Sequence, residues 1–175
     1  ALAATYSGHK WLLTSDALAG LTRTVADLHE LGATDVFCVA NSPGTGDLPD
    51  APYALVDAGA AASLMDGIRL ALRSLGNLPA DVRAQVDAWD PDGVARVIGP
   101  IWDDGALVAG RPKFARRLPS WQALEDKMVV DAFWDEAGVA RAPCALVPVA
   151  EARAASADLD LGDGVVWVGD NREGW

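Results

Sequence analysis

The sequence predicts an α/β fold, consisting of a Rossmann-like doubly wound parallel sheet followed by the beginning of a second, α+β subdomain. Short apolar runs of strand length alternate with helical stretches from Trp11 to Ile98. Such alternation is typical of a parallel sheet that helices cover on both faces, through right-handed crossovers. Beyond this stretch Gly and Pro become frequent and the alternation breaks. We therefore expect two domains, residues 1–110 and residues 111–175.

Strands of the first domain are expected where β-branched and apolar residues are concentrated. These segments are residues 11–14, 35–40, 53–56 and 94–98. Helices are expected between them, because apolar residues recur at helical spacing over residues 18–28, over residues 64–75 and after Pro79. Gly32 and Gly76 stand where helices commonly end.

The second domain is expected to open with a helix from Trp121 to Ala137, which Gly138 terminates. Residues 99–119 hold repeated Gly and Pro and are predicted to form a connector without regular structure. Two further strands, with a short Ala-rich helix between them, are predicted at residues 145–149 and 165–168.

Composition limits the classes of function. The chain has 175 residues, of which 51% are hydrophobic and 22% charged, so it can bury a sizeable core. Its formal net charge of −11 argues against a nucleic-acid partner. Cys38 and Cys144 lie far apart without metal-ligand spacing, so we expect neither a disulfide framework nor a zinc site.

The same features predict a cytoplasmic protein. No signal peptide is visible near the start, and no apolar run approaches the roughly 20 residues that cross a membrane. The sequence leaves the oligomeric state open, with a homodimer among the options. Because it begins without Met and stops at Trp175, we expect it to be a fragment of a longer protein.

The most informative segment begins at Asp126-Lys127, continues through a helical stretch to Ala137-Gly138, and ends at Ala142-Pro143. In this pattern it resembles the ATP-grasp superfamily, in particular D-alanine–D-alanine ligases and biotin-carboxylase-like enzymes. The resemblance implies that this helix begins the ATP-grasp module and that Lys127 reaches the phosphates of ATP. A lysine suits that role because its ammonium is a mobile point charge on a long stem. The alternative is a solvated helix lysine that pairs with Asp131 one turn later.

The end of the chain extends the resemblance. An apolar stretch, residues 165–168, runs toward Arg172-Glu173-Gly174. In D-alanine–D-alanine ligases a hydrophobic strand leads into Arg-Glu-Gly, which opens a glycine-rich loop over the β- and γ-phosphates. The resemblance therefore implies that Arg172, Glu173 and Gly174 contact the nucleotide. The alternative is an ordinary polar turn after a strand. One departure concerns Gly169, which stands where the family usually has a second ATP-contacting lysine.

The resemblance also implies a cofactor and a domain order. Members of the superfamily carry a Rossmann-like pre-ATP-grasp domain before the module, which suits the βαβ pattern of residues 11–98. They use ATP with Mg²⁺, and the Glu and Asn ligands of the metal lie in the last part of the module, which this sequence does not contain. We therefore expect residues 1–175 alone neither to bind MgATP tightly nor to turn over substrate.

The loop after the second expected strand contains Ser42, Gly44 and Gly46. A dinucleotide-binding motif is disfavoured there, because the third glycine of the fingerprint is absent and no helix follows directly. We predict instead a substrate-facing loop at the carboxyl end of the sheet, with these three residues as its contacts.

The connector carries a basic cluster, and two histidines stand apart from it. The cluster is interpreted either as a solvated connector or as a patch that steers anions toward the nucleotide. Its members are Arg111, Lys113, Arg116 and Arg117. His9 and His29 are isolated from any Ser or Cys signature, so no catalytic triad can be built.

The function implied by the resemblance is that of an ATP-dependent ligase. It would join a carboxylate to an amine, or to a related nucleophile, through an acyl phosphate, with charge neutralisation by Mg²⁺ and cationic side chains. Its partners would be small-molecule carboxylate and amine substrates. A non-catalytic Rossmann-like ligand-sensing or interaction domain is the alternative. A nicotinamide oxidoreductase is disfavoured by the incomplete glycine pattern.

Overall fold

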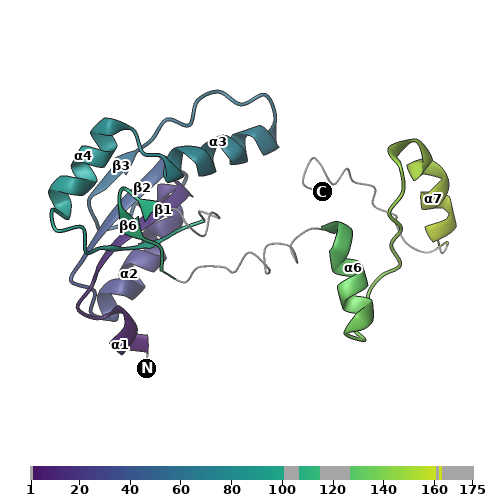
Figure 1. Cartoon of the computed structure of the whole chain (residues 1–175), viewed down its shortest axis with the longest axis horizontal. Coiled ribbons are helices and arrows are strands. Elements are labelled where there is room, and N and C mark those ends of the chain that lie inside the picture. The colour runs from purple at the N-terminus through teal and green to yellow at the C-terminus, as the bar shows by residue number, and fades with distance from the viewer. Residues whose placement is uncertain (1, 101–106, 115–126, 161, 163–175) are drawn as a thin grey trace. The chain divides into compact units, whose positions relative to one another are not determined.

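The structure is a computed structural model, and it describes residues 2–100, 107–114, 127–160 and 162. The chain divides into two compact units, residues 1–116 and residues 117–175, and each is described by itself. The first unit is a four-stranded, all-parallel sheet flanked by helices, which is the arrangement of a Rossmann-like α/β fold (Figure 1). None of the helices in the described residues is long and apolar enough to cross a membrane.

All four strands of the sheet run in the same direction, in the order β3-β2-β1-β4. Their bounds are β1 Lys10–Ala17, β2 Asp35–Ser42, β3 Tyr53–Leu55 and β4 Arg96–Ile98. The two long central strands are in register from Lys10 opposite Asp35 to Ala17 opposite Ser42. All four strands overlap the segments expected from the sequence.

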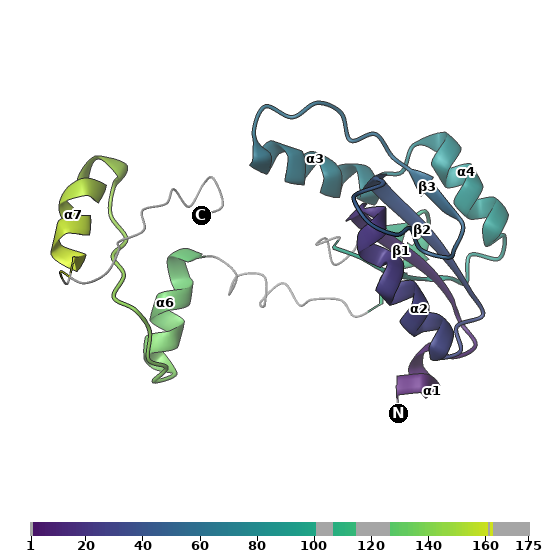
Figure 2. The same ribbon diagram turned by 180° about the vertical axis from the view of Figure 1, so that it is seen from behind.

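Helices cover the sheet on both faces (Figures 1 and 2). A short 3₁₀ turn, η1, and helix α2 lie over one face, and helices α3 and α4 lie over the other. Their bounds are η1 Leu18–Leu21, α2 Thr22–Glu30, α3 Leu64–Gly76 and α4 Ala80–Trp89, and a short helix, α1 Leu2–Tyr6, precedes β1. The expected helix over residues 18–28 thus begins as a 3₁₀ turn.

The side chains of β1 alternate between two cores. Trp11 and Leu13 are fully buried against η1 and α2, whereas Leu12 is fully buried under α3 and α4. Strand β2 follows the same pattern, with Cys38 on the first face and Val39 on the second. A strand buried on both faces has an almost continuously apolar sequence, which explains why β1 and β2 lack the apolar–polar alternation of surface strands.

Strand β4 begins at Arg96, two residues later than expected, because the preceding residues bind elsewhere. The carboxylate of Asp90 accepts hydrogen bonds from the backbone N–H groups of Val94 at 3.3 Å and Ala95 at 3.1 Å. These contacts turn the chain after α4 and leave three residues, Arg96–Ile98, to pair with β1.

The predicted connector contains regular structure, so this expectation is wrong for its central part. An antiparallel hairpin of two short strands, β5 Leu107–Val108 and β6 Arg111–Pro112, lies within it. Its two turn residues, Ala109 and Gly110, have φ angles of 49° and 82°, as a type I′ turn requires. Val108 is fully buried in the core under α3 and α4, which ties the hairpin to the first unit.

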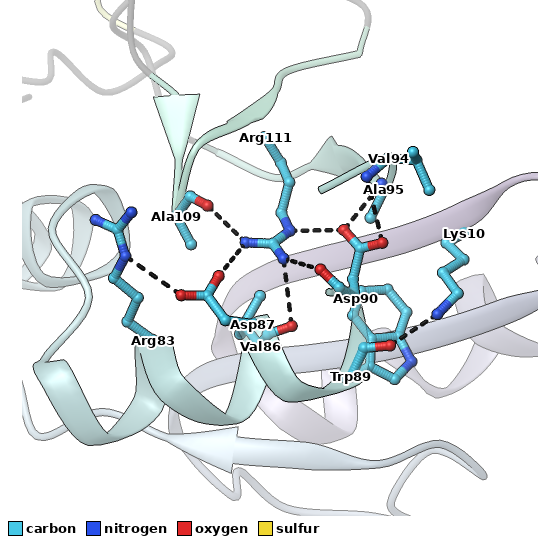
Figure 3. Close-up of polar contacts among 10 residues, drawn as sticks. All are labelled: Lys10, Arg83, Val86, Asp87, Trp89, Asp90, Val94, Ala95, Ala109 and Arg111. Atoms are coloured by element: carbon cyan, nitrogen blue, oxygen red, sulfur yellow. Dashed lines mark hydrogen bonds and ion pairs between the residues drawn. The ribbon is translucent and has the colours of Figure 1, made fainter. Parts of the chain in front are cut away.

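Arg111 holds this hairpin to the end of α4 (Figure 3). Its side chain is buried, with the whole residue only 2% exposed. The Nε–H group donates to Oδ2 of Asp90 at 2.8 Å, and Nη1 donates to Oδ1 of Asp87 at 2.7 Å and to the carbonyl of Ala109. Nη2 donates to the carbonyls of Asp90 at 2.5 Å and Val86 at 3.4 Å. Each nitrogen of the buried guanidinium therefore donates a hydrogen bond to an oxygen.

A second cation binds the same end of α4. Lys10 donates from Nζ to the carbonyl of Trp89 at 2.7 Å and lies 5.0 Å from the centre of the Trp89 ring. The last carbonyl groups of a helix lack partners within the helix and carry partial negative charge. Lys10 and Arg111 together satisfy them from two sides (Figure 3).

These contacts correct the interpretation of the basic cluster. Arg111 is neither solvated nor open to a passing anion, because Asp87 and Asp90 already neutralise it. Lys113 is half-buried and forms a parallel bridge with Val97 at the edge of the sheet. Arg116 and Arg117 lie outside the described residues.

The second unit contains helix α6 Lys127–Glu136, the 3₁₀ turn η2 Val149–Glu151 and helix α7 Ala152–Leu159. Gly138 follows α6 with a φ of 68°, which matches the expected helix end. The strand predicted at residues 145–149 is wrong, since residues 145–148 have no regular structure and Val149 opens η2. The strand predicted at residues 165–168 lies outside the described residues.

Arg111 and Arg83 both pair with Asp87, but only Arg111 also pairs with the buried Asp90. The loss of stability should therefore differ between substitutions of the two arginines. Arg111→Ala would leave Asp90 buried without its cation, so we expect the free energy of unfolding to fall by about 3–5 kcal/mol. Arg83→Ala removes an exposed pair with Asp87 and should cost less than about 1 kcal/mol. Urea unfolding followed by far-UV circular dichroism measures both. Equal losses for the two variants would contradict a structural role for Arg111.

The ion pair also predicts a loss of stability in acid. Burial alone would raise the pKa of Asp90, but hydrogen bonds from Arg111, Ala95 and Val94 outweigh it and lower that pKa. A carboxyl group with a lowered pKa in the folded state stabilises the protein above its unfolded pKa of about 3.9. This contribution is lost as pH falls through the folded value.

We therefore expect the free energy of unfolding to decline as the pH is lowered below about 4, with a smaller slope in Asp90→Asn. Urea titrations between neutral pH and pH 3 measure the slope. Asp92→Asn, which changes an exposed carboxyl group in the same turn, serves as the control. An unchanged slope in Asp90→Asn would show that other carboxyl groups cause the acid sensitivity.

Candidate functional site

The carboxyl edge of the parallel sheet is the candidate site. Strands β1 and β4 are neighbours in space, although β2 and β3 lie between them in sequence. The chain leaves β1 toward the face covered by α2 and reaches β4 from the face covered by α3 and α4. Open α/β sheets bind ligands outside the carboxyl ends of their strands, at such a reversal of strand order.

Two polar side chains at this edge have an oxygen without a hydrogen-bond partner. Thr14 directly follows the apolar run of β1 and is 2% exposed. Asn41 is near the end of β2, where Asn41 follows Phe37 and Val39 on the face of α3 and α4. Within the described part of the chain, Thr14 Oγ1 and Asn41 Oδ1 are buried and have no partner. A buried polar atom without a partner lowers the stability of the fold, so each such atom calls for an explanation.

The orientation of the Asn41 amide is fixed by its neighbours. Its Nδ2 group donates to the carbonyl of Val56 at 3.0 Å and to Oγ of Ser74 at 2.7 Å. The carbonyl of Val56 can only accept, and the Ser74 hydroxyl already donates to the carbonyl of Ala71 at 2.8 Å. The amide nitrogen must therefore face these two oxygens. The atom left without a partner is an acceptor, and it requires a donor.

The Thr14 hydroxyl fills the space that a side chain at Gly99 would need. A Cβ atom built on Gly99 would lie 1.7 Å from Thr14 Oγ1 and 2.9 Å from the carbonyl oxygen of Thr14. Any side chain at this position would collide with β1. The glycine is thus required where β4 passes the end of β1, next to the unpartnered hydroxyl.

Asp16 adds a carboxylate to this edge. It lies between Ser15, which is opposite Ala40, and Ala17, which is opposite Ser42, so the register places Asp16 opposite Asn41. Because side chains alternate along a strand, Asp16 lies on the same face as Thr14. The residue is exposed, unlike Thr14. One hydroxyl, one amide oxygen and one carboxylate therefore share the end of two adjacent strands.

The loop with Ser42, Gly44 and Gly46 follows β2 at this same edge. The Ser42 hydroxyl donates to the carbonyl of Asp16 at 3.1 Å. Gly44 has a φ of 71°, and a Cβ atom there would lie 2.9 Å from Cβ of Ala17, so the backbone packs closely on the end of β1. Gly46 has a φ of 120°. The structure explains these residues by loop packing, and their contact with a substrate stays a prediction.

The same loop also accepts hydrogen bonds from the first turn after β1. The backbone N–H of Ala19 donates to the carbonyl of Pro43 at 3.0 Å, and the hydroxyl of Thr22 donates to the carbonyl of Asp47 at 2.6 Å. In dinucleotide-binding folds the N–H groups of this turn bind the pyrophosphate. Here the N–H of Ala19 is already engaged, which adds to the reasons against a dinucleotide at this turn.

The expected nucleotide contacts belong to the second unit. Lys127 is the first described residue of α6. In the alternative interpretation its expected partner is Asp131. The carboxylate of Asp131 lies 3.7 Å from Nη1 of Arg141, and Nη2 of the same arginine pairs with Asp135 at 2.8 Å. Arg172, Glu173 and Gly174 lie outside the described residues, as does Gly169.

A second depression on the first unit is a weaker candidate. It has a volume of about 240 Å³ and lies between the α3–α4 turn and the β5–β6 turn. Its two polar side chains, Asn77 and Arg83, are already bound to the carbonyl of Arg73 and the carboxylate of Asp87. The depression therefore contains no side chain that needs a ligand.

Metal ligands do not cluster in the part of the chain that the structure describes, where no three His, Cys, Asp or Glu side chains come together. Cys38 is buried, and burial raises the pKa of its thiol to about 12, so it is not a nucleophile. Comparisons of the chain with family models, with curated proteins and with solved structures gave no match.

Thr14 and Asn41 were not predicted as site residues from the sequence. The available signal was a threonine and an asparagine that directly follow the apolar runs of two strands. Their common face and the contact of Thr14 with Gly99 follow from strand register, which the sequence alone does not give.

The unpartnered hydroxyl predicts that an apolar substitution strengthens the fold. Thr14→Val keeps the shape and removes the buried polar atom, so the free energy of unfolding should rise by about 1 kcal/mol. Thr34→Val, at an exposed position just before β2, should change it by less than about 0.5 kcal/mol. Urea unfolding measures both. A loss of stability in Thr14→Val would mean that the hydroxyl has a partner in solution.

Proposed function

We propose that this chain is the N-terminal part of an ATP-dependent ligase of the ATP-grasp type. Such an enzyme phosphorylates a carboxylate with ATP, and an amine or related nucleophile then displaces phosphate from the acyl phosphate. The observation that carries the proposal is the pattern from Asp126-Lys127 through Gly138 to Arg172-Glu173-Gly174. Helix α6, with Gly138 at a φ of 68° after it, supports the helix on which that pattern depends.

The first unit supports the proposal through its fold. A parallel α/β unit precedes α6 in the chain, as the pre-ATP-grasp domain precedes the module in the superfamily. At its carboxyl edge two buried oxygens, those of the Thr14 hydroxyl and the Asn41 amide, lack a hydrogen-bond partner in the described residues. In the proposed reaction Lys127, Arg172, Glu173 and Gly174 contact ATP, and Mg²⁺ is held by residues beyond this chain.

Acyl phosphate formation provides a direct test in the full-length protein. Hydroxylamine captures an acyl phosphate as a hydroxamate, which ferric chloride makes visible. With ATP, Mg²⁺, hydroxylamine and a panel of amino acids and short peptides as carboxylates, we expect ATP-dependent hydroxamate and a matching release of ADP. Absence of ATP-dependent hydroxamate with every carboxylate, in protein shown to be folded, would refute the ligase.

Lys127 has a matched control in the same unit. Lys127→Ala removes a charge-assisted hydrogen bond to phosphate, so kcat/KM for ATP should fall about 10-fold to 100-fold. Arg153→Ala removes a cation from an exposed position of α7 and should leave kcat/KM nearly unchanged. Equal kcat/KM in Lys127→Ala and the unaltered enzyme would assign Lys127 to the solvated helix surface.

A non-catalytic ligand-sensing domain is the second candidate. It is favoured by one observation, that the unpartnered oxygens of Thr14 and Asn41 both lie in the first unit. This candidate predicts binding of a small molecule without consumption of ATP, so the hydroxamate experiment separates the two.

A further inference from the structure

We propose that the outer edge of strand β3 docks an extended peptide segment of a partner protein, one that carries lysine or arginine side chains. The segment would add a strand to the sheet beside β3, held by main-chain hydrogen bonds. This inference does not depend on the proposed ligase, because it rests only on the backbone of β3 and on the charge of the residues that flank it.

Strand β3 is the outer strand of the sheet, and it pairs only with β2. The carbonyl of Pro52 accepts from the N–H of Cys38 at 2.9 Å, so Pro52 faces β2. Successive residues of a strand direct their backbone groups to opposite sides, so the N–H and C=O groups of Tyr53 and Leu55 point away from β2. In the part of the chain that the structure describes, these four groups have no hydrogen-bond partner. Pro52 is on the paired side and therefore removes no donor from the open edge.

The side chains beside this edge are apolar and exposed. Tyr53 is 45% exposed and Leu55 is 43% exposed. Both lie on the face of the sheet opposite to Ala54, which is buried under α3 and α4. An added strand would place every second side chain next to Tyr53 and Leu55, where an apolar residue loses contact with water.

The charge around β3 selects the partner. Residues 35–68 contain five aspartates and no Lys, Arg or His. Asp50 and Asp57 flank β3 on either side, and both are exposed. They attract a segment with Lys or Arg and repel an acidic one.

The same charge disfavours a second copy of this chain as the occupant. Pairing of two β3 edges would bring the aspartates of both copies together, in a protein whose formal net charge is already −11. Charged residues beside an edge strand commonly prevent such self-association. A basic segment of another protein is therefore the occupant that this edge fits.

Two model peptides test the proposal in the chain of residues 1–175. The probes are acetyl-Lys-Val-Thr-Val-Lys-amide and acetyl-Glu-Val-Thr-Val-Glu-amide, which differ only in the charged residues. Each is titrated at neutral pH and low ionic strength while ¹H–¹⁵N NMR spectra are recorded. We expect saturable shifts and slower hydrogen exchange of the Tyr53 and Leu55 amides with the lysine peptide alone. Equal shifts with both peptides, or with neither, would overturn the proposal. Shifts of these amides that depend on protein concentration without peptide would assign the edge to a second copy and overturn it too.

Two substitutions of Leu55 test the main-chain hydrogen bonds. Leu55→Pro removes an N–H group that points away from β2, so the pairing with β2 keeps its bonds. The affinity for the lysine peptide should fall about threefold to tenfold, as expected for one lost hydrogen bond. Leu55→Val keeps the N–H group and should bind within about twofold of the unaltered chain. Urea unfolding confirms that both variants are folded. Equal affinity in the two variants would exclude strand addition at this edge.

A charge variant tests the choice of partner without changing the backbone of β3. In the double variant Asp50→Asn and Asp57→Asn, the new asparagine at the second position keeps an acceptor for the N–H of Gly59, which Asp57 binds at 2.8 Å. Affinity for the lysine peptide should fall about threefold to tenfold and become less sensitive to salt. The double variant Asp92→Asn and Asp158→Asn removes the same charge from exposed positions elsewhere and should bind normally. Equal affinity in the two double variants would refute recognition of a basic segment.

Discussion

Strand β1 is buried on both faces, and the positions of the other elements of the first unit follow from the need to cover those two faces. Trp11 and Leu13 require η1 and α2 on one side, while Leu12 requires α3 and α4 on the other. A shift of one residue would exchange the two sets of side chains, so the register of β1 against β2 is strongly determined. The same register fixes which polar residues meet at the carboxyl ends. The candidate site is thus a consequence of how the core is packed.

The layer over one face depends in turn on Arg111. Helix α4 must end close to where β4 begins, and its last carbonyl groups then lie near the core. A buried ion pair gains little on balance, because desolvation of the two charges offsets their attraction. A hydrophobic pair, however, would leave the carbonyls of Val86 and Asp90 with only their backbone donors, the N–H groups of Asp90 and Gly93. The guanidinium of Arg111 adds a second donor to these carbonyls and also binds the Asp90 carboxylate, which positions the β5–β6 hairpin against α4.

Local patterns predicted most elements of the first unit, and long-range contacts account for what they missed. The apolar runs located all four strands, because strands buried on both faces are apolar almost throughout. Arg111 was misinterpreted because its partners, Asp87 and Asp90, are distant in sequence and only the fold brings them to it. The hairpin was missed because Ala109 takes a positive φ that glycine or asparagine usually supplies. The pairing of Asp16 with Asn41 likewise required the register.

The chemistry of the carboxyl edge differs from that of a phosphate site. Phosphate is bound by cations and free backbone N–H groups, yet the N–H of Ala19 at this edge is already bound to Pro43. What Thr14 and Asn41 offer instead is oxygen, beside the carboxylate of Asp16.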